Sequence, residues 1–212
     1  MSENDRQLSH SEYWDSRYVV SDGENPTHEW FRSFQTLQPF FQKNLFDVRD
    51  PATGADPYIL HLGSGDSDVP AGLEARGYKR QLCVDFSPVV VDMMTERHKE
   101  IPGIEWRKID VRNMVGMEDK SVDVAFDKGT LDAMIYGSPW SPPQEVKDNT
   151  SQYLKEVHRV LKDDGFFLYI TFRQPHFMQP LLNAGDLWNL DMQALSDQGS
   201  FDYYGYVITK KH

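Results

Sequence analysis

Short apolar runs alternate with longer segments of mixed polarity through the middle of the chain. The apolar runs predict strands at residues 58–62, 80–84, 104–109, 121–126 and 166–172. The segments between them predict helices at 69–76, 88–99 and 144–161. Because strands and helices of these lengths alternate, the pattern favours an α/β fold with right-handed crossovers and a doubly wound parallel sheet covered on both faces.

The two ends of the chain depart from this alternation. Residues 10–20 and 28–46 predict helices on either side of a polar turn, and Pro39 interrupts the second of them. Towards the C-terminus, residues 187–195 and 201–210 predict a hairpin that closes one edge of the sheet with an antiparallel strand. The pattern therefore predicts one domain with N-terminal helices and a mostly parallel sheet.

Composition indicates a globular protein inside the cell. The chain has 212 residues, which suits one α/β domain, and 39% hydrophobic with 13% aromatic residues supply a core. No apolar run reaches the roughly 18 residues of a membrane span, and the polar N-terminus has no signal-peptide character. Cys83 stands alone, so it cannot form an internal disulfide. We therefore expect a cytoplasmic protein, with the nucleus as the alternative.

Charge restricts the partners of this protein. The 22 Lys and Arg residues against 33 Asp and Glu residues give a formal net charge of −11. An acidic surface repels a phosphate backbone, and no stripe of Lys or Arg is visible, which argues against nucleic acid as the main substrate. The balance favours a cationic or neutral partner, although acidity that serves only solubility has the same signature. The oligomeric state stays open because no heptad or apolar stripe stands out.

The first predicted strand runs into a glycine-rich turn, LHLGSGDSDVP at 60–70. Gly63 and Gly65 permit a tight turn and a close approach of a ligand to the backbone. Asp68 stands where the dinucleotide fingerprint has its third glycine, and Asp66 adds a second carboxylate that would repel a pyrophosphate. This disfavours an NAD-dependent oxidoreductase. A cofactor without phosphate and with a cationic centre tolerates both carboxylates, and S-adenosylmethionine is such a molecule.

Acidic residues follow the later strands, at the end of the sheet where doubly wound folds bind ligands. Asp85 lies 22 positions after the first glycine, close to the spacing at which a carboxylate accepts hydrogen bonds from both ribose hydroxyls. Asp110 could accept a bond from an adenine amino group while Val111 packs on the ring. Asp127 and Lys128 follow the fourth strand and place charged groups at the mouth of the same crevice.

Several motifs carry a family resemblance: EYWDSRY at 12–18, EWF at 29–31, the glycine-rich turn, VDFS at 84–87 and DKGTLDA at 127–133. With these motifs the chain resembles class I S-adenosylmethionine-dependent methyltransferases, and more narrowly the family that includes lysine methyltransferases of translation elongation factor 1-alpha. The resemblance implies a single Rossmann-like, seven-stranded sheet whose C-terminal edge strand is antiparallel. It also implies a helical cap at 1–50 that contributes to the cofactor site, a core at 56–175 and a C-terminal hairpin at 186–212.

The same resemblance implies which residues bind S-adenosylmethionine and its product S-adenosylhomocysteine. They are Trp14, Tyr18, Trp30, Gly63, Gly65, Asp85, Phe86, Asp110, Val111 and Lys128. We expect no metal site, because the histidines lack ligand partners at metal spacing, and we expect His61 to be a satisfied interior residue.

Methyl transfer needs a nucleophile in line with the C–S bond, and a lysine amine must first lose a proton. Asp127 is the residue we expect to orient that amine, with a structural ion pair to Lys128 as the alternative. The acceptor implied by the resemblance is a lysine of a basic protein such as elongation factor 1-alpha. A small-molecule methyltransferase and a non-catalytic, cofactor-binding partner subunit stay open as alternatives. Trp140, in the proline-rich stretch 136–149, would contact substrate or anchor its loop.

Overall fold

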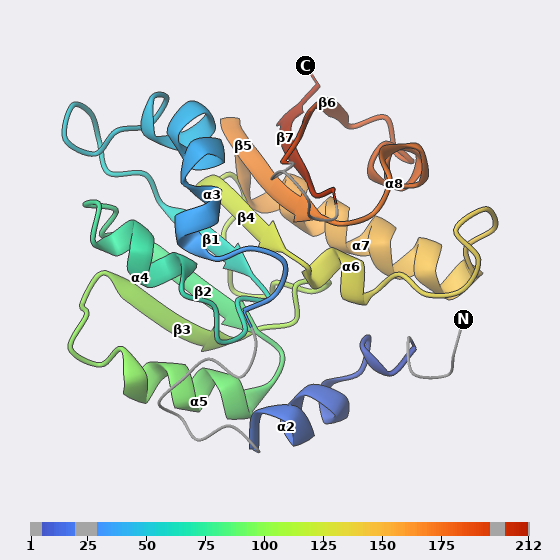
Figure 1. Cartoon of the computed structure of the whole chain (residues 1–212), viewed down its shortest axis with the longest axis horizontal. Helices are drawn as coiled ribbons and strands as arrows, with labels where there is room; N and C mark the ends of the chain where they lie inside the picture. Colours follow the sequence, from blue (N-terminus) through green and yellow to red (C-terminus); the bar gives the residue numbers. More distant parts are fainter. Residues whose placement is uncertain (1–5, 20–28, 196–201, 212) are drawn as a thin grey trace.

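A single mixed sheet forms the centre of the molecule (Figure 1). The computed structural model describes residues 6–19, 29–195 and 202–211. Within them the strand order is β3-β2-β1-β4-β5-β7-β6, and the strands from β1 to β5 run parallel. The strands are β1 (Ile59–Leu62), β2 (Gln81–Asp85), β3 (Ile104–Lys108), β4 (Val122–Lys128), β5 (Leu161–Thr171), β6 (Trp188–Ala194) and β7 (Tyr204–Lys210). The mostly parallel, doubly wound sheet predicted from the sequence is confirmed.

Helices cover both faces of this sheet. They are α2 (Ser11–Val19), α3 (Phe34–Phe41), the π-helical turn η1 (Gln42–Phe46), α4 (Val69–Glu74), α5 (Pro88–Arg97), α6 (Thr130–Ala133), α7 (Gln144–Val160) and α8 (Pro175–Leu182). One face packs on α7 and α8, and the other packs on α3, α4 and α5. No helix in the described ranges is long and apolar enough to cross a bilayer.

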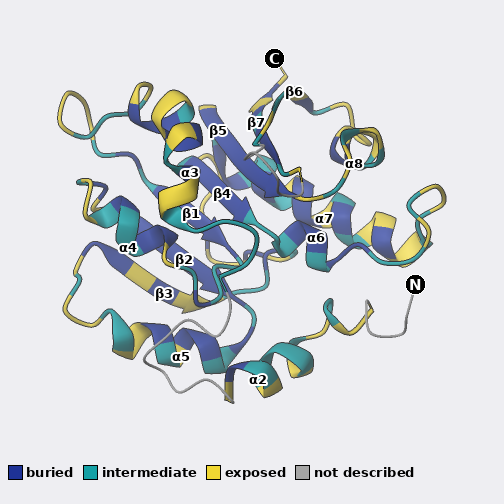
Figure 2. Ribbon diagram, in the orientation of Figure 1, coloured by how far each residue is buried: buried dark blue, intermediate teal, exposed yellow. Residues whose placement is uncertain are grey.

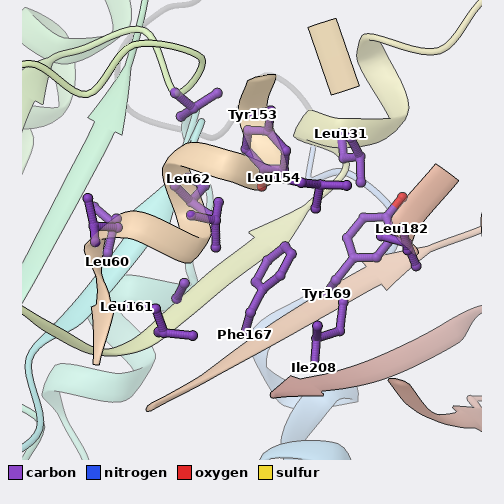
Figure 3. Close-up of a cluster of buried hydrophobic side chains, with 14 of the residues drawn as sticks. Leu60, Leu62, Leu131, Tyr153, Leu154, Leu161, Phe167, Tyr169, Leu182 and Ile208 are labelled. Carbon is purple, nitrogen blue, oxygen red and sulfur yellow. The ribbon is translucent and has the colours of Figure 1, made fainter. Parts of the chain in front are cut away.

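The core follows from the alternation of side chains along buried strands. Leu60 and Leu62 point to the face covered by α7, where they join Tyr153, Phe167 and other buried residues (Figure 3). Ile59, which precedes Leu60 and points to the opposite face, packs in the cluster under α3 and α4. Strands β1 and β2 are buried along their whole length, whereas exposed positions gather on the outer helices (Figure 2). Both faces of the sheet centre are therefore removed from water, as parallel sheets require.

The second N-terminal helix starts later than the pattern predicts. Residues 29–33 are not helical, and α3 begins at Phe34 after Ser33, whose side chain accepts a hydrogen bond from the amide of Thr36. Pro39 has no amide hydrogen, and the helix continues past it into the wider turn of η1. The apolar periodicity therefore predicts the helix correctly only for residues 34–46, which pack on the sheet. The two predicted turns, at 21–27 and 196–200, lie outside the described residues.

The C-terminal hairpin occupies the end of the sheet in an unexpected order. β7 is antiparallel to β5, as predicted, but it lies between β5 and β6, so that β6 rather than the C-terminal strand forms the edge. Tyr204, Tyr206 and Ile208 of β7 are buried, whereas β6 exposes much of its length. The more apolar strand takes the covered position, and the more polar one faces water along an edge.

Candidate functional site

A cavity of about 450 Å³ opens beyond the carboxyl ends of the parallel strands. Its walls come from the segments that follow β1, β2, β3, β4 and β5, together with α2 and residues 29–31. All ten residues that the sequence indicated for cofactor binding line it: Trp14, Tyr18, Trp30, Gly63, Gly65, Asp85, Phe86, Asp110, Val111 and Lys128. The structure therefore brings together residues from six separate stretches of the chain.

Two glycines shape the turn after β1. Gly63 has φ +60°, and a Cβ atom built there would lie 2.2 Å from Oγ1 of Thr130. Gly65 has φ +52°, and its Cβ would lie 2.9 Å from the hydroxyl oxygen of Tyr18. L-residues rarely adopt such φ values, and neither position has room for a side chain. The backbone of this turn thus faces the cavity directly.

Asp85 lies at the end of β2, in the floor of the cavity, with only 5% of its surface exposed. Its carboxylate accepts hydrogen bonds from the backbone amides of Gly65 (3.1 Å) and Ser87 (3.0 Å). Burial raises the pKa of Asp85 to about 6, against the opposing effect of these amide bonds. Since an ionised carboxylate offers about four acceptor sites, these amide bonds leave acceptor capacity for a hydroxyl group of a ligand.

Asp110 follows β3 on the same side of the cavity. The guanidinium of Arg112 bonds both of its carboxylate oxygens, at 3.0 and 2.7 Å. Burial raises the pKa of Asp110, but the Arg112 contacts outweigh it and hold that pKa below its usual value. Val111, which is 5% exposed, adds an apolar surface beside this pair. A fixed acceptor next to an apolar wall suits a heteroaromatic ring that carries an amino group.

The segment before α3 is fixed to the site by a buried ion pair. The ammonium of Lys128 donates to the carboxylate of Glu29 and to the carbonyl oxygen of Trp30, the latter at 2.7 Å. Glu29 also accepts from the hydroxyl of Ser67 (2.9 Å) and from the amide of Asp68 (2.8 Å). Lys128, 5% exposed in its side chain, therefore connects β4 with the N-terminal segment and the glycine turn.

Helix α2 closes another side of the cavity. The rings of Trp14 and Tyr18 stack with centroids 5.9 Å apart, and the indole nitrogen of Trp14 donates to the carbonyl of Leu8 at 2.8 Å. Asp15 accepts a hydrogen bond from the hydroxyl of Ser87, the residue that caps α5. Burial raises the pKa of Tyr18, so its hydroxyl stays protonated and can donate. These contacts place two aromatic rings over the cavity, whatever packing they also supply.

The charge of the cavity wall decides which ligand it suits. Five acidic residues line it (Glu29, Asp66, Asp85, Asp110, Asp132), against three basic ones (Arg112, Lys128, Arg173). Each of the three basic residues is paired with an acidic one. A phosphate group would meet an excess of carboxylates here, whereas a ligand with a ribose diol and a cationic centre would be favoured. The residues present therefore fit S-adenosylmethionine.

Comparison with known proteins agrees with this geometry. A family model described as a methyltransferase domain matches residues 60–169, which is more than half of the chain. The chain belongs to the S-adenosylmethionine-dependent methyltransferases. Among curated relatives of this methyltransferase, EEF1A lysine methyltransferase 4 of Mus musculus is 32% identical over 99% of the chain and 79% of the relative. The protein of the same name from Bos taurus is 35% identical over 91% and 73%.

Solved structures share the fold of the methyltransferase. The PH0226 protein of Pyrococcus horikoshii superposes with a TM-score of 0.63 at 16% identity, over 95% of this chain and all of that one. The N-methyltransferase NodS of Bradyrhizobium japonicum, solved with S-adenosylhomocysteine, gives 0.60 at 13% identity over 95% and 98%. The seven-stranded arrangement with antiparallel C-terminal strands is thus that of the class.

Asp127 is placed differently from the sequence-based expectation. Its fully buried carboxylate accepts hydrogen bonds from the amides of Thr130 (2.8 Å) and Leu131 (2.9 Å) and from the hydroxyl of Tyr153 (2.7 Å). It does not line the cavity of the methyltransferase, and Lys128 pairs with Glu29 instead. Successive side chains of a strand point to opposite faces, which sends Asp127 towards α7. Neither the predicted orienting role nor the alternative ion pair is supported.

Several important residues of the DKGTLDA segment received no role from the sequence. The hydroxyl of Thr130 donates to the carbonyls of Leu62 (2.8 Å) and Gly63 (3.0 Å), which joins α6 to the glycine turn. Asp132 lines the cavity and accepts from the hydroxyls of Tyr169 (2.6 Å) and Thr171 (2.7 Å). The motif itself was the available signal, but its letters do not say which side chain faces the cavity.

Two further expectations concern the histidines and metal binding. His61 of β1 is 2% exposed and shares a 2.7 Å hydrogen bond with the side chain of Gln81. Burial lowers the pKa of His61 to about 4, so it stays neutral at physiological pH. It is a satisfied interior residue, as predicted. In the described ranges no three His, Cys, Asp or Glu side chains converge as metal ligands.

The buried carboxyl of Asp127 should make stability depend on pH. Burial raises the pKa of Asp127 to about 7, above the value of about 4 for an unfolded chain. The folded state therefore holds a proton that the unfolded state releases, and its contribution to stability, full below pH 4, is lost as pH rises through 7. Between pH 5.5 and 8, we expect the wild type to lose about 2 kcal/mol more of its unfolding free energy than Asp127→Asn.

Urea denaturation of both proteins at the two pH values measures this difference. Other raised carboxyls, such as Asp85, titrate in both proteins and cancel in the comparison. The absolute stability of the asparagine variant does not enter, because each loss is the difference between two pH values for the same protein. Equal losses in wild type and variant would show that Asp127 stays ionised when buried.

Proposed function

We propose that this methyltransferase transfers a methyl group to the side-chain amine of a lysine in a protein, with translation elongation factor 1-alpha as the first candidate substrate. The observation that carries this proposal is the similarity to two relatives named EEF1A lysine methyltransferase 4, at 32% and 35% identity over nearly the whole chain. Proteins named eEF1A lysine and N-terminal methyltransferase are also similar, at 30% identity over 82% of the chain for that of Danio rerio.

The side chains around the cavity suggest how the cofactor would be held. Asp85 would accept hydrogen bonds from the ribose hydroxyls, and Asp110 with Val111 would contact the adenine. Trp14, Tyr18 and Trp30 would cover the cofactor, with the backbone at Gly63 and Gly65 against it. Lys128 would act by holding Glu29 and Trp30 in place. The bound cofactor supplies a methyl group on a positively charged sulfur.

The acidity of the chain supports a basic protein as the partner. A net charge of −11 attracts a positively charged surface and speeds the encounter with it. The wall of the cavity likewise carries more acidic than basic residues. The chain's own contribution to the chemistry is to orient the acceptor in line with the C–S bond and to exclude water, which are the main requirements of an uncomplicated displacement.

The test is transfer of a labelled methyl group from S-adenosylmethionine into a lysate of cells that lack this gene. The lysate is separated into protein and small-molecule fractions, and Asp85→Ala is run beside the wild type. A labelled protein band that disappears with the variant supports the proposal, and mass spectrometry then identifies the modified residue. Label confined to small molecules would assign the enzyme to another acceptor class, and cofactor binding without any transfer would make it a partner subunit.

A further inference from the structure

Two phenylalanines form the wall of the cavity at the end where β4 and β5 finish. Phe31 and Phe172 both line the cavity, and their rings meet edge to face with centroids 5.4 Å apart. Phe172 follows β5 and is 48% exposed, so this wall reaches the solvent.

The backbone at Phe31 is strained. Its φ is +64°, and the amide of Arg32 donates to the carbonyl of Trp30 at 2.7 Å across it, which is the i to i+2 bond of a γ-turn. A bulky aromatic residue rarely adopts a positive φ, and such conformations persist only where the surroundings enforce them. Here the enforcing contact is Lys128, whose ammonium donates to the same Trp30 carbonyl.

The strained turn directs the ring of Phe31 onto the backbone that follows β4. Gly129 has φ +98°, and a Cβ atom there would lie 3.1 Å from the Phe31 ring. The ring of Phe31 therefore packs against the backbone at Gly129, where a larger residue would crowd it. The strained backbone, the Lys128–Glu29 ion pair and Gly129 together fix the position of the Phe31 ring. Backbone strain of this kind is typical of functional sites.

The order of the strands relates this wall to the rest of the cavity. Asp85 and Asp110, which suit the nucleoside, lie at the carboxyl ends of β2 and β3. The ring of Phe31 packs on Gly129 at the end of β4, and Phe172 follows β5 in the chain. Because β1 separates β2 from β4 in the sheet, the two phenylalanines stand at the opposite end of the cavity from the nucleoside side. That end is where an acceptor has to enter.

Charged groups near the wall are already paired with one another. Lys128 is bonded to Glu29, and the guanidinium of Arg173 lies 3.4 Å from the carboxylate of Asp132. The wall is thus apolar, with balanced charges beside it. An apolar surface favours the neutral form of an amine over the ammonium, and only the neutral form has the lone pair that displacement requires.

We propose that Phe31 and Phe172 border an acceptor slot that admits one unbranched alkylamine and removes its water. This rests on the proposed transfer to a lysine amine and names the residues that position it. The amine nitrogen bonds to the methyl carbon while the C–S bond breaks, and the electron pair stays on sulfur. The methylated ammonium then loses its proton to solvent. The two rings contact each other edge to face, so the four-carbon chain of the amine would lie along their shared apolar surface.

Calorimetry with two ligands tests the slot without requiring turnover. One ligand is S-adenosylhomocysteine, and the other is its analogue with nitrogen in place of the sulfur, which carries an arm made of a two-carbon link to an amine nitrogen followed by an unbranched four-carbon chain. We expect the wild type to bind the second ligand about tenfold or more tightly than the first, because the arm fills the slot. Phe31→Ala and Phe172→Ala should lose most of this gain and keep their affinity for S-adenosylhomocysteine within about twofold.

Phe34→Ala is the matched control, since Phe34 packs on Gly72 outside the cavity. It should leave both affinities unchanged. Phe172 is half-exposed, so its alanine variant tests the slot even where Phe31→Ala folds poorly. Equal loss for both ligands would show that the rings only support the cofactor site, and an undiminished gain would overturn the slot. A gain that depends on both rings, in an enzyme that labels no protein, would keep the slot and refute the protein substrate.

Discussion

Replacing Asp85 by alanine should weaken binding of S-adenosylhomocysteine by about 100-fold or more. Each hydrogen bond between a charged group and a ligand contributes about 1.5–3 kcal/mol, and a ribose diol donates two of them. The carboxylate is 5% exposed, and the amides of Gly65 and Ser87 hold it in place at the end of β2. Isothermal titration at pH 7.5 measures the loss.

Asp85→Asn is the control for this variant. It keeps the size of the side chain and one acceptor oxygen, so we expect an intermediate loss. Affinity of the wild type should also fall as pH drops below about 6, because burial raises the pKa of Asp85 to about 6 and the protonated acid accepts fewer hydrogen bonds. An alanine variant that binds within a few-fold of the wild type would remove Asp85 from the cofactor site.

Gly63→Ala should destabilise the fold far more than Gly116→Ala, although both glycines have positive φ. At Gly116 nothing lies within 4 Å of a new Cβ atom, so only backbone strain of about 1 kcal/mol is added. At Gly63 the new atom would lie 2.2 Å from Oγ1 and 2.9 Å from Cβ of Thr130. A different rotamer cannot move the Cβ of Thr130, so α6 or the glycine turn must shift, and we expect a loss of about 3–5 kcal/mol.

Urea denaturation of the two variants measures the difference. Adding Thr130→Ala to Gly63→Ala should restore part of the loss, since it removes two of the three close atoms. The same change added to Gly116→Ala should restore nothing. Equal losses at Gly63 and Gly116 would mean that the turn after β1 has more room than the structure indicates.

The amino-acid pattern predicted the strands well where burial is complete on both faces. β1 and β2 are buried along their whole length because helices cover both sides of them. It missed α6, which has only four residues, and α8, which contains Pro180. It also placed the C-terminal strand at the edge of the sheet, whereas β6 is the edge strand. The lengths of the two hairpin strands do not indicate which of them pairs with β5.

The site was predicted in its members but less well in their tasks. The carboxylates that follow β2 and β3 are located by a simple rule on strand ends, and both line the cavity. Asp127 and Asp132 lie five positions apart in one motif, and only the path of the backbone decides which of them faces the cavity. Nothing in the sequence indicates the positive φ of Phe31, because that conformation is normally marked by glycine or asparagine.

The bond between Glu29 and Lys128 joins residues 99 positions apart, which has a consequence for biosynthesis. When the N-terminal third of this chain leaves the ribosome, the strand that carries Lys128 has not yet been made. The segment that holds Trp30 and Phe31 must therefore wait in a non-native conformation until β4 has paired with β1. Cofactor can help only from this step onward, so the nascent enzyme would gain its ligand after β4 has joined β1, β2 and β3.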